Sequence, residues 1–144
     1  MLSIPELEHL QEARARISGS LHRTPVASSR ALSERVGRPV FLKCENLQRT
    51  GSFKVRGALN RILELDNMAR GRGVATVSAG NHAQAVAWAA ARAGISATVV
   101  MPANASPTKA RASEEYGAEM ILQGTIIGAF DLALEVAQDR GLTF

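Results

Sequence analysis

The chain has 144 residues, of which 46% are hydrophobic and 21% are charged, and its formal net charge is +4. This balance excludes a disordered chain, and no apolar run approaches the ~20 residues that cross a bilayer. The basic residues are scattered and only 4% of residues are aromatic, so neither a basic stripe nor a stacking platform for nucleic acid is expected.

Cysteine usage and the N-terminus indicate a cytoplasmic protein. Cys44 is the only cysteine, which excludes an internal disulfide and fits a reducing compartment. We expect it to be a small buried side chain beside a strand. The N-terminal residues carry neither a basic nor a long apolar stretch, so no signal peptide is predicted.

The first half of the chain predicts helices separated by short extended segments. Ser3 and Glu6 have the spacing of a capping box, which predicts a helix from about Ile4 to Ile17. Pro25 favours an extended segment before it. Further elements are predicted as a helix at 29–36, a strand at 39–44, a polar loop at 45–51 and a helix from 52 with an apolar stripe. Residues 70–72 are predicted to be a solvated turn.

The second half repeats a strand followed by a helix. Strands are predicted at 74–78, 97–101 and 119–123, and helices at 83–93, from Pro107 with Ser106 as N-cap, and at 129–140. Residues 142–144 begin a further strand, so the chain is expected to be a truncated form of a larger enzyme. Short connections between alternating strands and helices predict an α/β fold: a parallel twisted sheet with helices on both faces.

Lys54 is the first candidate for chemistry, in the segment Thr50–Ala58. It lies in the first turn of its predicted helix, where the helix dipole disfavours an ammonium group. A lysine that forms a Schiff base needs a lowered pKa, so this position suits a reactive amine. The alternative is a solvated lysine at the start of a helix.

The segment Ser78–His82 is the second candidate, because it joins a predicted strand to a predicted helix. Free backbone N–H groups at a helix N-terminus bind anions, and ligands dock at the carboxyl ends of parallel strands. The alternative is an ordinary turn capped by Asn81.

Taken together, Ser-Phe-Lys-x-Arg-Gly-Ala and Ser-Ala-Gly-Asn-His-Ala-Gln resemble the fold-type II pyridoxal-phosphate enzymes, and among them the threonine/serine dehydratases. Thr24-Pro25, Phe41–Gln48, Val100–Pro102, Pro107–Lys109 and Tyr116–Ala118 follow in the family's order. The resemblance implies that residues 1–72 are the N-terminal part of a large domain that carries the cofactor lysine. Residues 73–144 would then form a small α/β domain.

The resemblance also implies roles for particular residues. Lys54 matches the lysine that carries pyridoxal 5'-phosphate and moves the α-proton of the substrate, and Phe53 matches the aromatic residue beside the cofactor ring. Asn81 matches the side chain that bonds the cofactor's 3-hydroxyl. The substrate carboxylate would be bound by the loop Ser78, Ala79, Gly80, Asn81 and His82. The family's glycine-rich phosphate cradle would lie beyond Phe144.

The implied reaction is α,β-elimination of threonine or serine to a 2-oxo acid and ammonia, in a cytoplasmic lyase of amino-acid metabolism such as isoleucine biosynthesis. Serine racemases usually carry a second serine where this chain has Ala79, which favours elimination over racemisation. Cysteine-synthase-like relatives usually have a threonine where this chain has His82.

A second hypothesis is a non-catalytic α/β remnant, in which an unpaired sheet edge would favour a homo-oligomer. No metal is expected, because His9 and His22 have no ligand-like spacing to partners.

Overall fold

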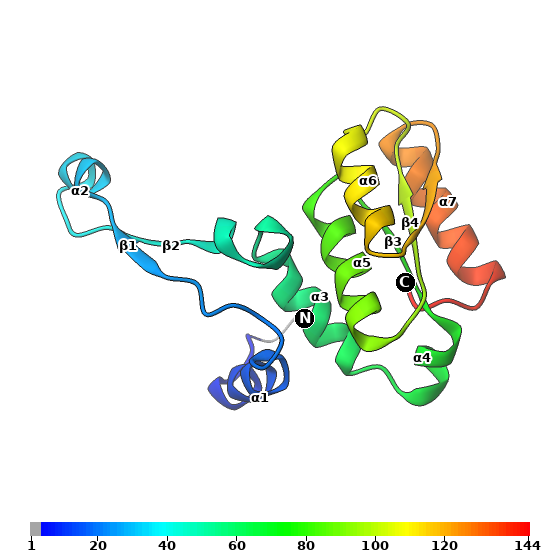
Figure 1. Ribbon diagram of the computed structural model, residues 1–144, viewed down its shortest axis with the longest axis horizontal. Helices are drawn as coiled ribbons and strands as arrows, with labels where there is room; N and C mark the ends of the chain where they lie inside the picture. Colours follow the sequence, from blue (N-terminus) through cyan, green and yellow to red (C-terminus); the bar gives the residue numbers. More distant parts are fainter. Residues whose placement is uncertain (1–3) are drawn as a thin grey trace.

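The computed structural model describes residues 4–144. It consists of an α/β body and a long arm that projects from it (Figure 1). The elements of the first half are α1 (Leu7–Ile17), β1 (Val26–Ser28), α2 (Arg30–Val36), β2 (Phe41–Lys43), the 3-10 turns η1 (Glu45–Leu47) and η2 (Arg49–Gly51), α3 (Lys54–Leu63) and α4 (Asn67–Arg72). Those of the second half are β3 (Val74–Val77), α5 (Asn81–Ala93), β4 (Ala97–Met101), α6 (Pro107–Glu115), β5 (Glu119–Leu122) and α7 (Ile126–Asp139).

The arm is formed by β1 and β2, with α2 at its tip (Figure 1). The two strands pair antiparallel, with Val26 opposite Lys43. Ser29 caps α2 by accepting from the backbone N–H of Leu32, and Gly37 ends it in the left-handed region, so the helix predicted at 29–36 is present. All residues of both strands are exposed, so the arm contributes nothing to the buried core.

The body contains a parallel sheet in the order β3-β4-β5. Thr143 bridges to Val74 in parallel on the free side of β3, as expected for a strand that begins near residue 142. Helices α5 and α6 cover one face of the sheet and α7 covers the other (Figure 1). The predicted α/β fold with helices on both faces is confirmed.

Helix α5 lies at the centre of the body, between α3 and the sheet. Its buried residues are Ala83, Ala85, Val86, Ala87, Ala89 and Ala90. Side chains this small let two neighbouring layers approach the helix closely. The apolar stripe predicted on α3 packs here through Val55, Leu59 and Ile62, so residues from both sides of position 73 share one core. The division into domains at 72 and 73 stays a prediction.

Several boundaries differ from those predicted. Helix α1 begins at Leu7, after Glu6, whose side chain makes no capping bond; Ser3 lies outside the described residues. Residues 70–72 are not a turn but the end of α4, because Asp66 caps that helix by accepting from Ala69 N–H at 2.8 Å. The polar loop at 45–51 is two 3-10 turns, and Cys44 is only half-buried.

The helix predicted from 129 begins at Ile126, because the side chain of Thr125 accepts from Gly128 N–H. No helix within residues 4–144 is both long enough and apolar enough to span a membrane.

Candidate active site

Lys54 is the first residue of α3, and its side chain is exposed. Its Nζ lies 5.4 Å from the centroid of the neighbouring Phe53 ring, within the range of a cation–π contact. Across residues 4–144 no hydrogen bond or ion pair engages this amine. The structure therefore presents an accessible primary amine beside an aromatic face, at the position predicted from the sequence.

The second predicted segment joins β3 to α5. Strand β3 ends at Val77 and α5 begins at Asn81, so Asn81 and His82 belong to the first helical turn and the loop is shorter than predicted. Ser78 Oγ accepts a hydrogen bond from Gly80 N–H at 3.1 Å. Gly80, not Asn81, is the N-cap. The first backbone N–H groups of a helix have no partner within it, so this turn can bind an anion.

The packing of α3 against α5 brings the two segments together. Burial lowers the pKa of the His82 imidazole from its usual 6.5, and the positive charge of Lys54 lowers it further. The turn before Lys54, η2, also packs against α5.

Lys109, on α6, also borders the loop. A Cβ placed on Gly80 would lie 3.2 Å from Nζ of Lys109, so any larger residue at position 80 would have to displace the lysine. The sequence placed Lys109 in a matching motif without giving it a role. Its proximity to Gly80 depends on the packing of α6 against α5.

A charged network behind Lys54 was also missed from the sequence. Arg56, two residues after Lys54, donates two hydrogen bonds to Glu45, at 2.8 and 2.7 Å. Thr24 Oγ1 donates to the same carboxylate, and Lys43 Nζ donates to the backbone oxygen of Thr24 at 2.6 Å. The bonds from Arg56 above all, together with the bond from Thr24 and the charges of Arg56 and Lys43, lower the pKa of Glu45 to about 2. The network joins the base of the arm to the first turn of α3.

Two cavities lie near the segments described above. A cavity of 510 Å³ lies between α1 and the base of the arm, and one of 210 Å³ is lined by His82 together with Arg61, Thr76 and Phe144. Only the smaller one includes a predicted site residue.

The chain is similar to known proteins over most of its length. A family model described as "Pyridoxal-phosphate dependent enzyme" matches residues 17–144. The L-threonine ammonia-lyase of Thermotoga maritima is 47% identical over 139 residues, which cover 96% of this chain and 35% of the relative.

Solved structures give the same result. Maize serine racemase superposes with a TM-score of 0.91 at 39% identity, covering 98% of this chain and 43% of that chain. The threonine deaminase of T.th. superposes with a TM-score of 0.84 at 41% identity, covering 96% of this chain and 44% of that chain. The chain thus spans less than half the length of these relatives. Because the family model matches most of its length, the chain belongs to the pyridoxal-phosphate-dependent enzymes of fold type II.

Proposed function

We propose that this chain is the lysine-bearing part of a threonine/serine dehydratase, which eliminates the β-hydroxyl group of its substrate and yields a 2-oxo acid and ammonia. The observation that supports this most directly is the packing of α3, which begins at Lys54, and of the turn before it against α5. To react at its α-carbon, an α-amino acid must be held by its carboxylate with a basic amine close to the α-proton. The anion-binding turn and Lys54 would supply these two groups.

The residues of this chain fit the aldehyde, the ring face and the 3-hydroxyl of pyridoxal phosphate. The exposed Lys54 amine can be linked to the aldehyde carbon, and Phe53 offers an aromatic face next to it. Asn81, exposed at the start of α5, would bond the 3-hydroxyl. In family members the bound cofactor acts as an electron sink that makes the α-proton of the substrate acidic.

Each residue of the site then has a separate task. Lys54 Nζ would take the α-proton of the substrate and serve as general base. The backbone N–H groups from Ser78 to His82 would hold the substrate carboxylate. A neutral His82 adds no charge to this turn, because burial and Lys54 both lower its pKa. The substrate would therefore be positioned mainly by backbone groups.

Serine racemase is the alternative within the family. The superposition on the maize serine racemase is the observation that favours this alternative. A racemase needs a group that returns the proton to the opposite face of the α-carbon. Ala79 has no such group, which favours elimination. A non-catalytic remnant that binds anions at the same turn is the alternative from another class.

The test is a chimera in which residues 1–144 are followed by the part of the Thermotoga maritima relative that lies beyond the matched region. We expect it to release ammonia and a 2-oxo acid from L-threonine or L-serine, and expect Lys54→Ala to abolish this activity. Ala79→Ser should add measurable serine racemisation. A folded chimera that deaminates equally well with Lys54→Ala would overturn the proposal.

The isolated chain gives a second measurement. It is mixed with pyridoxal phosphate and reduced with borohydride, and the labelled peptides are mapped. Labelling concentrated on Lys54 supports the proposal, whereas equal labelling of Lys43, Lys54 and Lys109 supports the remnant.

We further propose a cytoplasmic location, a role in amino-acid metabolism such as isoleucine biosynthesis, and association of the complete enzyme into a homo-oligomer.

A further inference from the structure

The turn before Lys54 contains an unfavourable backbone conformation. Thr50 has a φ of 60° and a ψ of 11°, and within residues 4–144 it is the only residue other than glycine with a positive φ. The left-handed region is disfavoured for a β-branched side chain, and a residue held there costs about 1–3 kcal/mol. Gly51 follows with a φ of 69°, so the chain reverses sharply three residues before the lysine.

Hydrogen bonds on the preceding side hold this turn in place. Gln48 is 5% exposed, and its Oε1 accepts from the backbone N–H groups of His22 and Arg49, at 3.0 and 2.9 Å. Its Nε2 donates to the backbone oxygen of His22 at 2.8 Å. Gly51 N–H closes the turn onto the backbone oxygen of Gln48 at 2.9 Å. A conformation as costly as that of Thr50 persists only where its surroundings fix it in this way.

The same turn contains two buried hydroxyl groups without partners. Thr50 Oγ1 and Ser52 Oγ make no hydrogen bond with any described residue, and Ser52 is 7% exposed. An unsatisfied buried polar group costs about 1–3 kcal/mol. The turn also packs against α5. Strain and unsatisfied polar groups therefore coincide in the segment that joins the arm to Lys54 and contacts the helix of the anion-binding turn.

We infer that Thr50 is a positioning residue: its enforced left-handed conformation directs the start of α3 so that Lys54 faces the first turn of α5. The inference rests on the proposed function, because it assigns a purpose to the placement of the Lys54 amine. A relaxed turn would let the first residue of α3 vary in direction. The strained turn is fixed by Gln48 on one side and by α5 on the other. It therefore allows α3, and Lys54 at its start, only one orientation.

The experiment needs no cofactor. Lys43, Lys54 and Lys109 are the lysines of the sequence, so reductive methylation with ¹³C-formaldehyde gives resolvable resonances. Because Lys54 Nζ lies over the Phe53 ring, its methyl resonance should be displaced by the ring current. Thr50→Gly should raise the melting temperature by about 2–6 °C as strain is relieved. It should also remove at least half of that displacement and move the pKa of His82 toward 6.5.

Two variants separate positioning from a merely structural role. Thr50→Ser keeps the Cβ and the hydroxyl, and should retain the Lys54 resonance. Arg38→Gly adds the same backbone freedom at an exposed position of the arm, and should leave Lys54 and His82 unchanged.

A Thr50→Gly chain that melts higher but keeps both signals would show that the strain has no bearing on Lys54 and would overturn the inference. A chain that melts lower would overturn it as well, because the conformation would then not be strained. These readouts are independent of catalysis, so failure of the chimera to deaminate its substrate would count against the proposed function alone.

Discussion

Glu45 and Arg56 show how single residues link the arm to the site. The carboxylate is 16% exposed and accepts two hydrogen bonds from the guanidinium of Arg56, which is 35% exposed. Its folded pKa is lowered from 4.5 to about 2, so its contribution to stability is complete above pH 4.5 and is lost as the pH falls toward 2.

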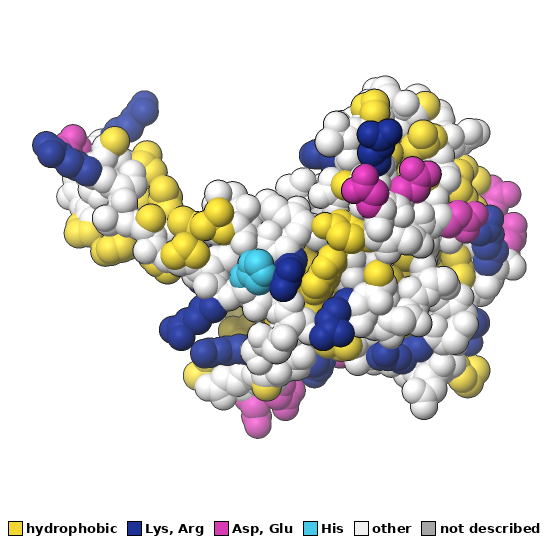
Figure 2. All heavy atoms as spheres, viewed as in Figure 1, with side chains coloured by type: hydrophobic (Ala, Val, Ile, Leu, Met, Phe, Trp, Pro, Cys, Tyr) yellow, Lys and Arg dark blue, Asp and Glu magenta, His cyan; other side chains and the backbone are white. Residues whose placement is uncertain are grey.

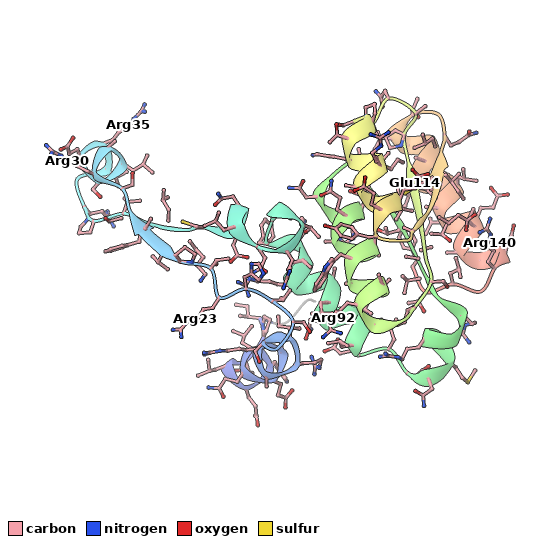
Figure 3. All side chains as sticks on the ribbon, viewed as in Figure 1. Arg23, Arg30, Arg35, Arg92, Glu114 and Arg140 are labelled. Carbon is pink, nitrogen blue, oxygen red and sulfur yellow. The ribbon has the colours of Figure 1, made fainter. Side chains whose placement is uncertain are left out.

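Glu45→Gln should therefore lower the free energy of unfolding at pH 7 by about 1–3 kcal/mol, after allowance for screening by solvent. Urea titrations at pH 7 and at about pH 2 measure this loss, which should be nearly absent at the lower pH. Glu34→Gln is the matched control, because Glu34 pairs with Arg30 where the two side chains are 64% and 93% exposed. Both arginines at the tip of the arm, Arg30 and Arg35, extend away from the body (Figure 3). An equal loss in both variants would contradict the role given to Glu45.

The Lys54–His82 pair gives a second prediction at this scale. Lys54→Met removes the nearby charge, so the pKa of His82 should rise but stay below 6.5, because burial is the larger cause of its shift. Proton NMR of the His82 ring during a pH titration measures this change.

The folded pKa of His82 is depressed, so the unfolded state binds the proton more readily and stability falls as the pH drops below 6.5. This fall should be smaller in Lys54→Met. Lys43→Met is the control, and an unchanged pKa in Lys54→Met would show that the two groups are not neighbours.

At the scale of elements, the connection between α4 and β3 depends on one glycine. Gly73 has a φ of 99° and a ψ of −176°, a region open essentially to glycine alone. A Cβ at this position would collide with the side chain of Ser96 and lie 3.0 Å from its backbone oxygen. Arg92, near the end of α5, and Arg140, after α7, lie on either side of this end of the body (Figure 3).

Gly73→Ala should lower the free energy of unfolding by about 2–4 kcal/mol, from strain and overlap together. Gly71→Ala is its neighbour in α4, where a Cβ would meet nothing within 4 Å, and it should be neutral or stabilise by about 0.5–1 kcal/mol. Thermal unfolding of the two variants measures the contrast. Similar melting temperatures would contradict this account of the junction.

At the scale of the whole molecule, the arm exposes apolar side chains that a folded protein normally covers. Val26, Val36 and Phe41 on the arm, and Leu47 in the adjoining turn η1, are between 54% and 66% exposed. Figure 2 shows hydrophobic side chains along the arm. An apolar surface beside unpaired strand edges favours association with a second copy of the chain.

Sedimentation velocity should show association that increases with concentration, and Phe41→Lys together with Val26→Lys should reduce it. Leu7→Lys on α1, at a position 68% exposed, is the control and should have little effect. A chain that is monomeric at every concentration would contradict the prediction.

Much of the body follows from local sequence patterns. The three strand–helix repeats, the apolar stripe of α3 and the strand 97–101 depend on hydrophobic periodicity and on glycines that end helices, and the structure confirms them. The positions of Lys54 at a helix start and of Ser78 at a strand end are likewise local, because each is set by its neighbours in the chain.

What the sequence by itself determined was therefore the fold class, the order of the strands and helices after residue 73, and the two segments that carry the proposed site; it predicted neither α4 nor β1. Only the tertiary structure decided which groups meet: Gly80 with Lys109, Arg56 with Glu45, and α3 with α5. It also decided that Thr50 is held in a left-handed conformation, since Gln48 and α5 impose this on a residue whose own preference opposes it. The physical reason is that periodicity and capping act over a few neighbouring residues, whereas these contacts depend on how α3, α5, α6 and the arm pack.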